Sequence, residues 1–221
     1  MSTMYEMIMD LPLFKGVGKD HVSSFLEKTN VNFVNYEAGD LIVSKGEDVN
    51  MVRFVIAGDV RIIHELNGCG IRVEELSHKG RVLGVDRLYG MATGYSCDVY
   101  AHSRTSIMEF SKEQYLRLLR TDNIYLLNFF NYLSRRAQRP VEAVETYTSG
   151  SIRSKLSLLL SILTDSESEG LVISATPEDL SAYLAVDKVE VESWINDAQR
   201  DGVVKYEDGE MKIVSRESFL S

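Results

Sequence analysis

"AYLAVDKVEVESWINDAQRDGVV", residues 182–204, has the apolar spacing of two helices joined by a short turn. Asp187 precedes the second apolar run and is predicted to cap that helix, with Glu190 three residues later in an Asp version of the capping box. The inner face of the second helix would consist of four residues, Val191, Trp194, Ile195 and Ala198. The stretch therefore predicts a helix-turn-helix, a common protein device for reading DNA.

The flanking residues extend this prediction in both directions. Upstream, Thr176 is a good helix cap and Pro177 suits the first helical position, so a helix should begin there. Before it lie an acidic loop and an apolar helix, "KLSLLLSIL". Downstream, "GVVKYEDGEMKIV" reads as two short strands around the turn Asp208-Gly209. Helices followed by a hairpin predict a winged helix-turn-helix domain over residues 150–221.

The charge of this segment is the opposite of what DNA usually attracts. The whole chain carries a formal net charge of −9, and residues 150–221 hold 7 Lys and Arg against 14 Asp and Glu. A nucleic-acid-binding domain is normally basic. Two interpretations therefore stay open: a DNA reader that makes few charged contacts, or an interaction module that keeps the fold to bind protein.

Residues 1–110 have a different texture. Short helices are predicted over residues 1–30, because Val22, Phe25 and Leu26 recur at helical spacing. From Val31 to Phe110, short β-branched and aromatic runs such as "MVRFVIAG" and "VRIIHEL" alternate with glycine-containing turns. This pattern is typical of an antiparallel roll or sandwich.

A long helix is predicted from about Asp122, with a linker around Gly150. Its apolar stripe, suited to a helix-helix seam, consists of Leu126, Phe130, Leu133, Ala137, Val141 and Val144. Pro140 should kink or break this helix, because its ring clashes with the carbonyl of Arg136. Three basic residues lie on the same helix, Arg135, Arg136 and Arg139. They form a solvated face, a phosphate contact or a latch on the acidic C-terminal segment.

The order of these parts resembles the catabolite-activator/Fnr (Crp/Fnr) family of bacterial transcription regulators. The resemblance is carried by "YEAGDLIVSKGE", "FVIAGDVRI", "KGRVLGVDRLYG", the helix-turn-helix stretch and the closing "IVSRESFL". It implies an α+β protein with three parts: a cyclic-nucleotide-binding-like β jelly roll over 1–121, a dimerisation helix and hinge over 122–149, and the winged helix-turn-helix over 150–221. The seam residues of the long helix would then join two copies of the chain.

The family resemblance also places an effector site in the roll. Members that bind cyclic nucleotides hold the ribose with a Glu and the phosphate with an Arg-Ser pair. The matching positions here are Val85 for the Glu and Tyr95 for the Arg, so that Gly84 and Ser96 alone are kept. An Arg–phosphate contact is about twice as strong as a neutral one, and its loss weakens binding. The predicted effector site is Gly84, Val85, Asp86, Arg87, Tyr95 and Ser96, and it should not bind cyclic AMP.

On the second helix, the residues expected to contact DNA are Lys188, Val189, Glu192, Ser193, Asn196 and Arg200. Lys188 can donate to guanine, Val189 can touch a thymine methyl group, and Glu192 can accept from cytosine. The expected partners are palindromic DNA, a second copy of the chain and RNA polymerase. The expected role is regulation of transcription.

Other functions are not supported by the residues. Cys69 and Cys97 are isolated and cannot supply an iron–sulfur cluster. His64, His78 and His102 lack the spacing of a metal site, so a metal-dependent enzyme on a jelly roll is not expected. We predict no metal, no cofactor and no catalytic residues, and leave the small-molecule effector unidentified. Without an apolar run long enough to span a membrane or a signal peptide, the chain is expected in the cytoplasm.

Overall fold

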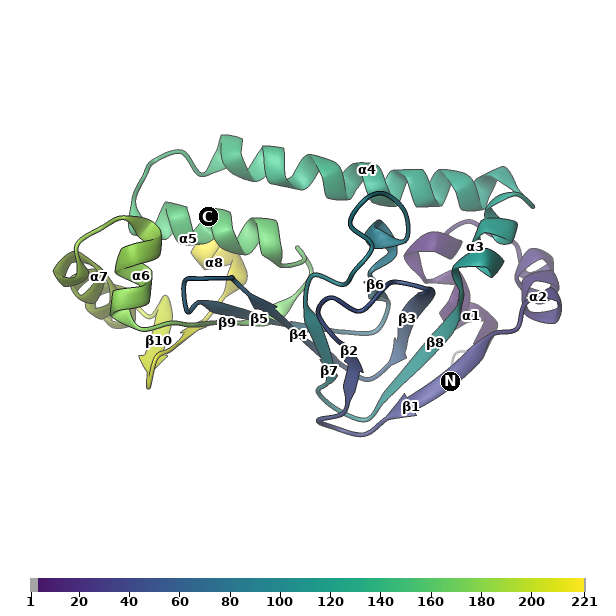
Figure 1. Ribbon diagram of the computed structural model, residues 1–221, viewed down its shortest axis with the longest axis horizontal. Helices are drawn as coiled ribbons and strands as arrows, with labels where there is room; N and C mark the ends of the chain where they lie inside the picture. The colour runs from purple at the N-terminus through teal and green to yellow at the C-terminus, as the bar shows by residue number, and fades with distance from the viewer. Residues whose placement is uncertain (1–3, 221) are drawn as a thin grey trace. The chain divides into compact units, whose positions relative to one another are not determined.

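The computed structural model describes residues 4–220, and these fold into helices and strands in the predicted order (Figure 1). The N-terminal helices are α1 (Met4–Met9), η1 (Pro12–Phe14) and α2 (Lys19–Lys28). Eight strands follow, with the short helix η2 (Val85–Arg87) among them: β1 (Asn32–Tyr36), β2 (Leu41–Val43), β3 (Met51–Ala57), β4 (Val60–Glu65), β5 (Arg72–Ser77), β6 (Val82–Leu83), β7 (Asp98–Ala101) and β8 (Thr105–Ser111).

Helices dominate the rest of the chain. After β8 come α3 (Lys112–Leu119), α4 (Asn123–Thr146), α5 (Ile152–Leu163), β9 (Glu169–Ser174), α6 (Pro177–Leu184), α7 (Lys188–Arg200), β10 (Val204–Glu207), β11 (Glu210–Ile213) and α8 (Arg216–Leu220). Contacts divide the chain into two compact units. The first unit contains the residues up to Val60 together with His78–Gln138, and the second contains Arg61–Ser77 together with the residues from Arg139 onward.

The first unit contains most of the predicted roll. One of its sheets has the strand order β1-β8-β3-β6, and β2 pairs separately with β7. All these pairings are antiparallel, with β8 in the centre between β1 and β3. The inner face of β3 and β8 carries Phe54 and Phe110, which meet Phe14 and Phe25 from the N-terminal helices at ring distances between 5.2 and 6.0 Å. Aromatic packing thus fixes α2 against the sheet.

Helix α4 corrects one expectation. Pro140 was expected to kink or break it, and of these the break does not occur, since a single helix runs from Asn123 to Thr146 (Figure 1). Proline removes one backbone N–H donor. Arg136 pairs with Asp86 at 3.3 Å, and Arg139 donates to the carbonyl oxygens of Ser161 and Thr164. These contacts hold side chains of α4 close before Pro140. They also show that neither arginine is part of a merely solvated face.

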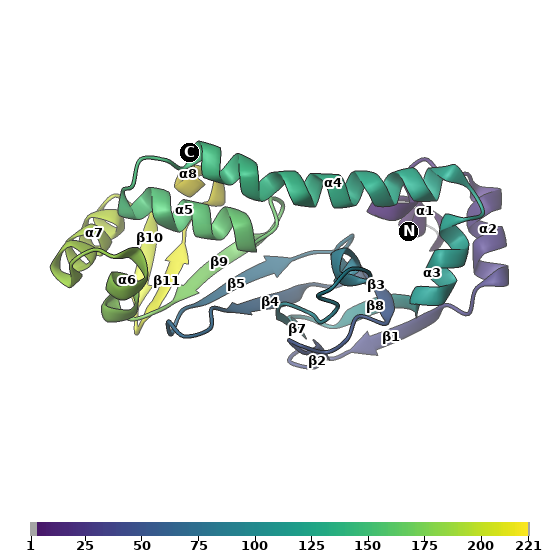
Figure 2. The same ribbon diagram turned by 45° about the horizontal axis from the view of Figure 1, so that its top comes forward.

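The second unit has a core of its own. Apolar side chains of α5, α6, α7 and the strands β9–β11 bury one another, and Leu156, Leu160 and Val191 have no exposed surface. Ile71 and Val73 of the first half of the chain belong to the same core. The strands of this unit follow the order β10-β11-β9-β5-β4, as Figure 2 shows. The hairpin β4–β5 therefore extends the C-terminal sheet.

The pairing between β5 and β9 could not be expected from the order of the parts. It is antiparallel, with Arg72 opposite Ser174 and Val73 opposite Ile173. Strand β9 itself, "EGLVIS", lies where the sequence predicted only an acidic loop before the next helix. The sequence signal for this strand was the apolar residues at alternate positions, Leu171 and Ile173, both of which are buried. A six-residue stretch has little strand preference of its own, so pairing with its two neighbours, β5 and β11, determines its conformation.

Two other local predictions for this segment, the cap of α6 and the hairpin turn, are confirmed. Thr176 caps α6, and its hydroxyl accepts from the backbone N–H of Asp179 at 3.1 Å. The Asp179 carboxylate accepts in return from the N–H of Thr176 at 3.0 Å. Asp208 and Gly209 both have positive φ, at 50° and 81°, as a tight two-residue hairpin turn requires.

Candidate effector and nucleic-acid sites

The predicted effector residues come together in the first unit around Gly84, which follows β6. Gly84 has a φ of +66°, and a Cβ there would lie only 2.4 Å from Cε1 of Tyr95. Only glycine therefore fits, because the Tyr95 ring lies directly against the backbone. Val85 and Tyr95 are buried, with 1% and 4% of their surfaces exposed. The two residues that replace the expected charged pair thus belong to the protein interior.

The hydroxyl of Tyr95 is held by a cation from β3. Nη1 of Arg53 donates to the Tyr95 hydroxyl at 2.8 Å, and Nε of Arg53 donates to Glu109 on β8 at 2.9 Å. The carboxylate of Glu47 lies 3.8 Å from the same guanidinium. Burial raises the pKa of the Tyr95 hydroxyl, since the charged form is poorly solvated there. The strongest donor and acceptor groups of this neighbourhood already satisfy one another.

The other predicted effector residues make single contacts. Asp86 forms its ion pair with Arg136 of α4, and Arg87 donates to the carbonyl oxygen of Gly94 at 3.3 Å. Ser96 is exposed. The residues that sequence reasoning missed here are Arg53 and Glu109. Their signal was a lone charge in each of two otherwise apolar strands, "MVRFVIA" and "TSIMEFS".

The predicted DNA contacts all lie on one surface of α7, in the second unit. Its opposite face is buried through Val191, Ile195 and Ala198. All six predicted residues are exposed, namely Lys188, Val189, Glu192, Ser193, Asn196 and Arg200. Val189 has 75% of its surface exposed, although it is apolar. Helix α6 packs against α7, and the hairpin β10–β11 follows it (Figure 1).

The two cations of this face are compensated by nearby carboxylates. Lys188 forms an ion pair with Glu178 of α6 and lies 3.5 Å from Glu192. Arg200 pairs with Asp197 at 2.7 Å. The hydrogen bond from Lys188 lowers the pKa of Glu178, and the pKa of Lys188 is raised by the same bond. A ligand that uses Lys188 must therefore compete with two acids.

One detail of α7 differs from the prediction. Asp187 occupies the cap position, with extended backbone angles, but its side chain accepts no cap hydrogen bond. The Asp187–Glu190 capping box is therefore absent, and the N–H of Glu190 bonds to the backbone oxygen of Asp187 instead, at 3.0 Å. A backbone bond of this kind satisfies the same donor that the Asp187 side chain was expected to reach. Glu190 keeps only its favourable position at the positive end of the helix.

The apolar stripe of α4 is largely uncovered. Phe130, Val141 and Val144 expose 53, 58 and 55% of their surfaces, and Ala137 is also exposed. Leu126 and Leu133 are half-buried. The opposite face of the same helix packs inward through Tyr125, Phe129 and Ala143. Large apolar side chains in a row on a helix surface are a common mark of a protein–protein contact.

A buried carboxylate fastens the hairpin β4–β5 within the second unit. Glu75 of β5 has no exposed surface, and its Oε2 accepts from the backbone N–H of Asp165 at 2.6 Å. His64 of β4 lies 3.5 Å from the same carboxylate. Burial lowers the pKa of Arg216, an effect that the nearby charge of Glu75 opposes. Arg139 of α4 lies 3.7 Å from Asp165. The second unit thus contains a charge cluster built from four separate elements.

Residues 33–122 match the family described as "Cyclic nucleotide-binding domain". The matched segment includes β1 to β8 and α3, and it includes Arg53, Gly84, Tyr95 and Glu109. No curated protein sequence is significantly similar to the chain.

Solved structures extend the likeness to the whole chain. The catabolite activator protein of Thermus thermophilus is 20% identical, with 94% of this chain and 96% of that chain covered and a TM-score of 0.52. The c-di-GMP responsive global regulator CLP of Xanthomonas campestris is 15% identical, with 90% and 100% covered and a TM-score of 0.54. The resemblance to catabolite-activator regulators is confirmed at the level of the fold. The first is named as a catabolite activator protein and the second as a global regulator.

Among residues 4–220, no group of three or more His, Cys, Asp or Glu is arranged to hold a metal ion. Over the same residues, every helix is too short or too polar to cross a membrane.

Proposed function

We propose that the chain is a transcription regulator that binds palindromic DNA as a homodimer through a winged helix-turn-helix, and whose roll does not bind cyclic AMP. The observation that carries this proposal is the outer face of α7. Its six predicted contact residues are exposed on one surface, after a cyclic nucleotide-binding domain in a chain with the fold of a catabolite activator protein. Helices α6 and α7 would form the helix-turn-helix, and β10–β11 would be the wing.

The proposed division of labour has three parts. Residues 1–121 would sense an effector, residues 122–149 would join two copies, and residues 150–221 would bind DNA. The exposed stripe of Phe130, Val141 and Val144 supports the dimer, since a second copy would cover it. RNA polymerase and the cytoplasm are the partner and the location that such a role requires.

The test is selection from random DNA by the purified full-length chain at low salt. We expect an enriched palindrome with half-sites about one helical turn, ~34 Å, apart. Lys188→Ala should weaken specific binding by roughly 1–3 kcal/mol and relax the preference at one base pair of each half-site. Lys205→Ala, on the hairpin, is the matched control. It should weaken all sequences alike.

The dimer has its own test. Phe130→Asp with Val141→Asp places two charges on the exposed stripe, so light scattering should report monomers. Glu142→Lys with Glu145→Lys changes charge on the same helix outside the stripe and should leave the dimer intact. A stripe variant that remains dimeric contradicts the seam. Circular dichroism checks that each variant is folded.

The proposal that the roll does not bind cyclic AMP is based on Tyr95. Its ring fills the space against Gly84, and Arg53 is already bound to Tyr95 and Glu109. Calorimetry with cyclic AMP should therefore show no binding at micromolar concentration. Binding at that concentration would overturn this part alone.

A second function, a protein-interaction module without sequence-specific DNA binding, is favoured by one observation. Lys188 and Arg200 are each paired with carboxylates, and residues 150–221 carry twice as many acids as bases. Failure of the selection at low salt, with and without a cell extract to supply an effector, would establish this alternative.

A further inference from the structure

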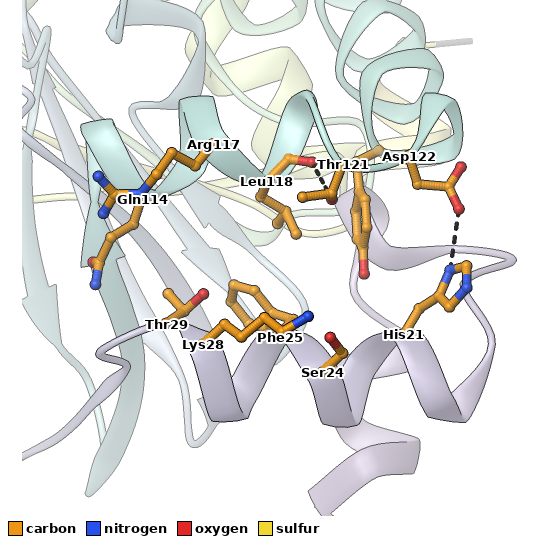
Figure 3. Close-up of a pocket in the computed structure, with 11 residues that line it drawn as sticks. His21, Ser24, Phe25, Lys28, Thr29, Gln114, Arg117, Leu118, Thr121 and Asp122 are labelled. Carbon is orange, nitrogen blue, oxygen red and sulfur yellow. Dashed lines mark hydrogen bonds and ion pairs between the residues drawn. The ribbon is translucent and has the colours of Figure 1, made fainter.

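A hollow of about 420 Å³ lies in the first unit between α2, α3 and the start of α4, away from the roll residues that correspond to the cyclic nucleotide site (Figure 3). Small-molecule sites commonly have volumes of ~300–1,000 Å³. Figure 3 shows Lys28 and Ser24 rising from α2, and Gln114, Arg117 and Leu118 on α3 opposite them. The hollow is therefore large enough for a small organic molecule.

Two cations border the hollow without a contact partner. Lys28 of α2 and Arg117 of α3 both line it, and within residues 4–220 neither side chain has a hydrogen bond or an ion pair at contact distance. Arg117 shares its helix with Glu113, four residues earlier, but the two form no contact ion pair. On α7, by contrast, each cation is paired. The hollow thus offers positive charge that forms no hydrogen bond or contact ion pair within residues 4–220.

A buried hydroxyl adds a second and independent feature. Tyr125 of α4 lines the hollow and is only 2% exposed, yet its hydroxyl has no hydrogen-bond partner in the part of the chain that the structure describes. A buried hydroxyl without a partner costs roughly 1–3 kcal/mol. Burial, and to a smaller extent the charge of Asp122, raises the pKa of Tyr125 to about 12. The hydroxyl therefore stays protonated at neutral pH and can donate a hydrogen bond to an acceptor.

The other residues of the hollow limit what can bind. Phe25 and Leu118 provide an apolar surface between the polar groups. His21 and Asp122 pair at 3.1 Å, and the hydroxyl of Thr121 donates to the carbonyl oxygen of Leu118 at 2.7 Å (Figure 3). Those groups are already satisfied. The unsatisfied groups are two cations and one hydroxyl donor, placed around an apolar surface.

We propose that this hollow binds a small organic monocarboxylate with an apolar body, such as an aryl or short alkyl acid. The carboxylate would accept from Lys28 and Arg117, since charge-assisted bonds of this kind are the strongest available there. The apolar body would cover Phe25 and Leu118, and a ligand oxygen would accept from Tyr125. Inorganic phosphate has no apolar body and should bind much more weakly. The site does not depend on the proposed DNA binding.

The experiment uses calorimetry on the full-length chain with phenylacetate, benzoate and octanoate as probes. Two controls separate the parts of the ligand: 2-phenylethanol keeps the apolar body without the charge, and inorganic phosphate keeps the charge without the body. We expect at least one carboxylate to bind, with both controls weaker by tenfold or more. If none of the three acids binds, or if phosphate or the alcohol binds as well as the acids, the proposal is wrong.

Variants locate the binding. Arg117→Gln should weaken the affinity for the acid about tenfold, the equivalent of ~1.4 kcal/mol. Tyr125→Phe should weaken it by a smaller factor, because it removes one neutral donor. Arg120→Gln, on the same stretch of chain but outside the lining, is the matched control and should bind like the natural chain. Equal losses for Arg117→Gln and Arg120→Gln would show that the acid binds elsewhere.

Discussion

The first unit contains two places where a cation and a buried tyrosine hydroxyl line the same region, and they differ in one respect. In the roll, Arg53 donates to the hydroxyl of Tyr95 at 2.8 Å and to Glu109 at 2.9 Å. In the hollow between the helices, Arg117 has no contact partner and the hydroxyl of Tyr125 has none either. An arginine and a tyrosine hydroxyl are thus bonded to protein groups in the roll, whereas in the hollow they have hydrogen-bonding capacity left for a ligand.

Under the proposal that the roll does not bind cyclic AMP, the difference is that the donors and acceptors of the roll interior are already paired with one another. The strands and the glycine of the roll are kept, and residues 33–122 still match a cyclic nucleotide-binding domain. Tyr95 stands where the family pattern has an arginine, and its hydroxyl accepts a hydrogen bond from Arg53, which also donates to Glu109. A ligand would have to break these bonds before making its own, which lowers its affinity.

The largest expected effect comes from removing the cation of the closed site. Arg53→Met would leave Glu109 in the interior without its partner, and such a change typically destabilises a protein by about 3–5 kcal/mol. Because the two side chains keep 13 and 14% of their surfaces exposed, we expect the lower end of this range. Urea unfolding measures it. Arg104→Met, which breaks an exposed pair with Glu37, is the control and should change stability by about 1 kcal/mol or less. Equal losses of stability would mean that the Arg53–Glu109 pair contributes no more to stability than an exposed ion pair.

The tyrosine of the closed site should have the next largest effect. Tyr95→Phe removes a hydrogen bond to a charged group, so the free energy of unfolding should fall by roughly 1.5–3 kcal/mol. The ring and its contact with Gly84 remain, which separates the hydrogen bond from packing. A neutral result would show that Arg53 finds another acceptor, with Glu47 the nearest candidate at 3.8 Å.

A third prediction applies the comparison to the cations of α7. Glu178→Gln removes an acid that pairs with Lys188, so Lys188 becomes available and one negative charge leaves the proposed DNA surface. DNA affinity should rise about two- to fivefold, equivalent to ~0.4–1 kcal/mol. Fluorescence anisotropy with the selected palindrome measures this change. Glu207→Gln removes the same charge from the hairpin without touching Lys188 and should have less effect. If both variants bind alike, only the net charge matters.

The smallest effect is expected at the tyrosine of the open hollow. Tyr125→Phe removes a hydroxyl that has no partner, so stability should change by less than about 0.5 kcal/mol or should increase slightly. Thermal unfolding of this variant beside Tyr95→Phe tests the comparison most directly. A loss at Tyr125 as large as that at Tyr95 would mean that the hydroxyl is bonded after all.

Sequence patterns predicted the local elements of this protein well. The Thr176 cap, the turn at Asp208-Gly209 and the buried face of α7 follow from interactions within a few residues, so short stretches determine them. The side-chain cap expected from Asp187 did not form. The order of parts was enough to predict a roll followed by helices. The break expected at Pro140 was wrong. The contacts of Arg136 and Arg139 beside it join residues far apart along the chain, so no local pattern announces them.

The sites were harder to predict for the same reason. Val85 and Tyr95 could be identified as departures from a family pattern, but the bond between Tyr95 and Arg53 joins residues 42 positions apart. The hollow combines residues of α2 with residues of α3 and α4, and its main property is the absence of partners. A sequence pattern does not show which side chains lack a hydrogen-bond partner in the folded protein. Strand β9 escaped notice because its neighbour β5 lies in the other half of the chain.

The pairing of β5 with β9 also has a consequence for synthesis on the ribosome. Strand β5 ends at Ser77 and β9 begins at Glu169, so 92 positions separate them. At ~5–20 residues per second, the outer edge of β5 waits about 5–18 s for its partner. An unpaired edge strand invites pairing with other chains. During this period, the β4–β5 hairpins of two chains growing on the same messenger RNA can pair with each other. A chain truncated before residue 169 lacks β9, so its β5 edge stays unpaired.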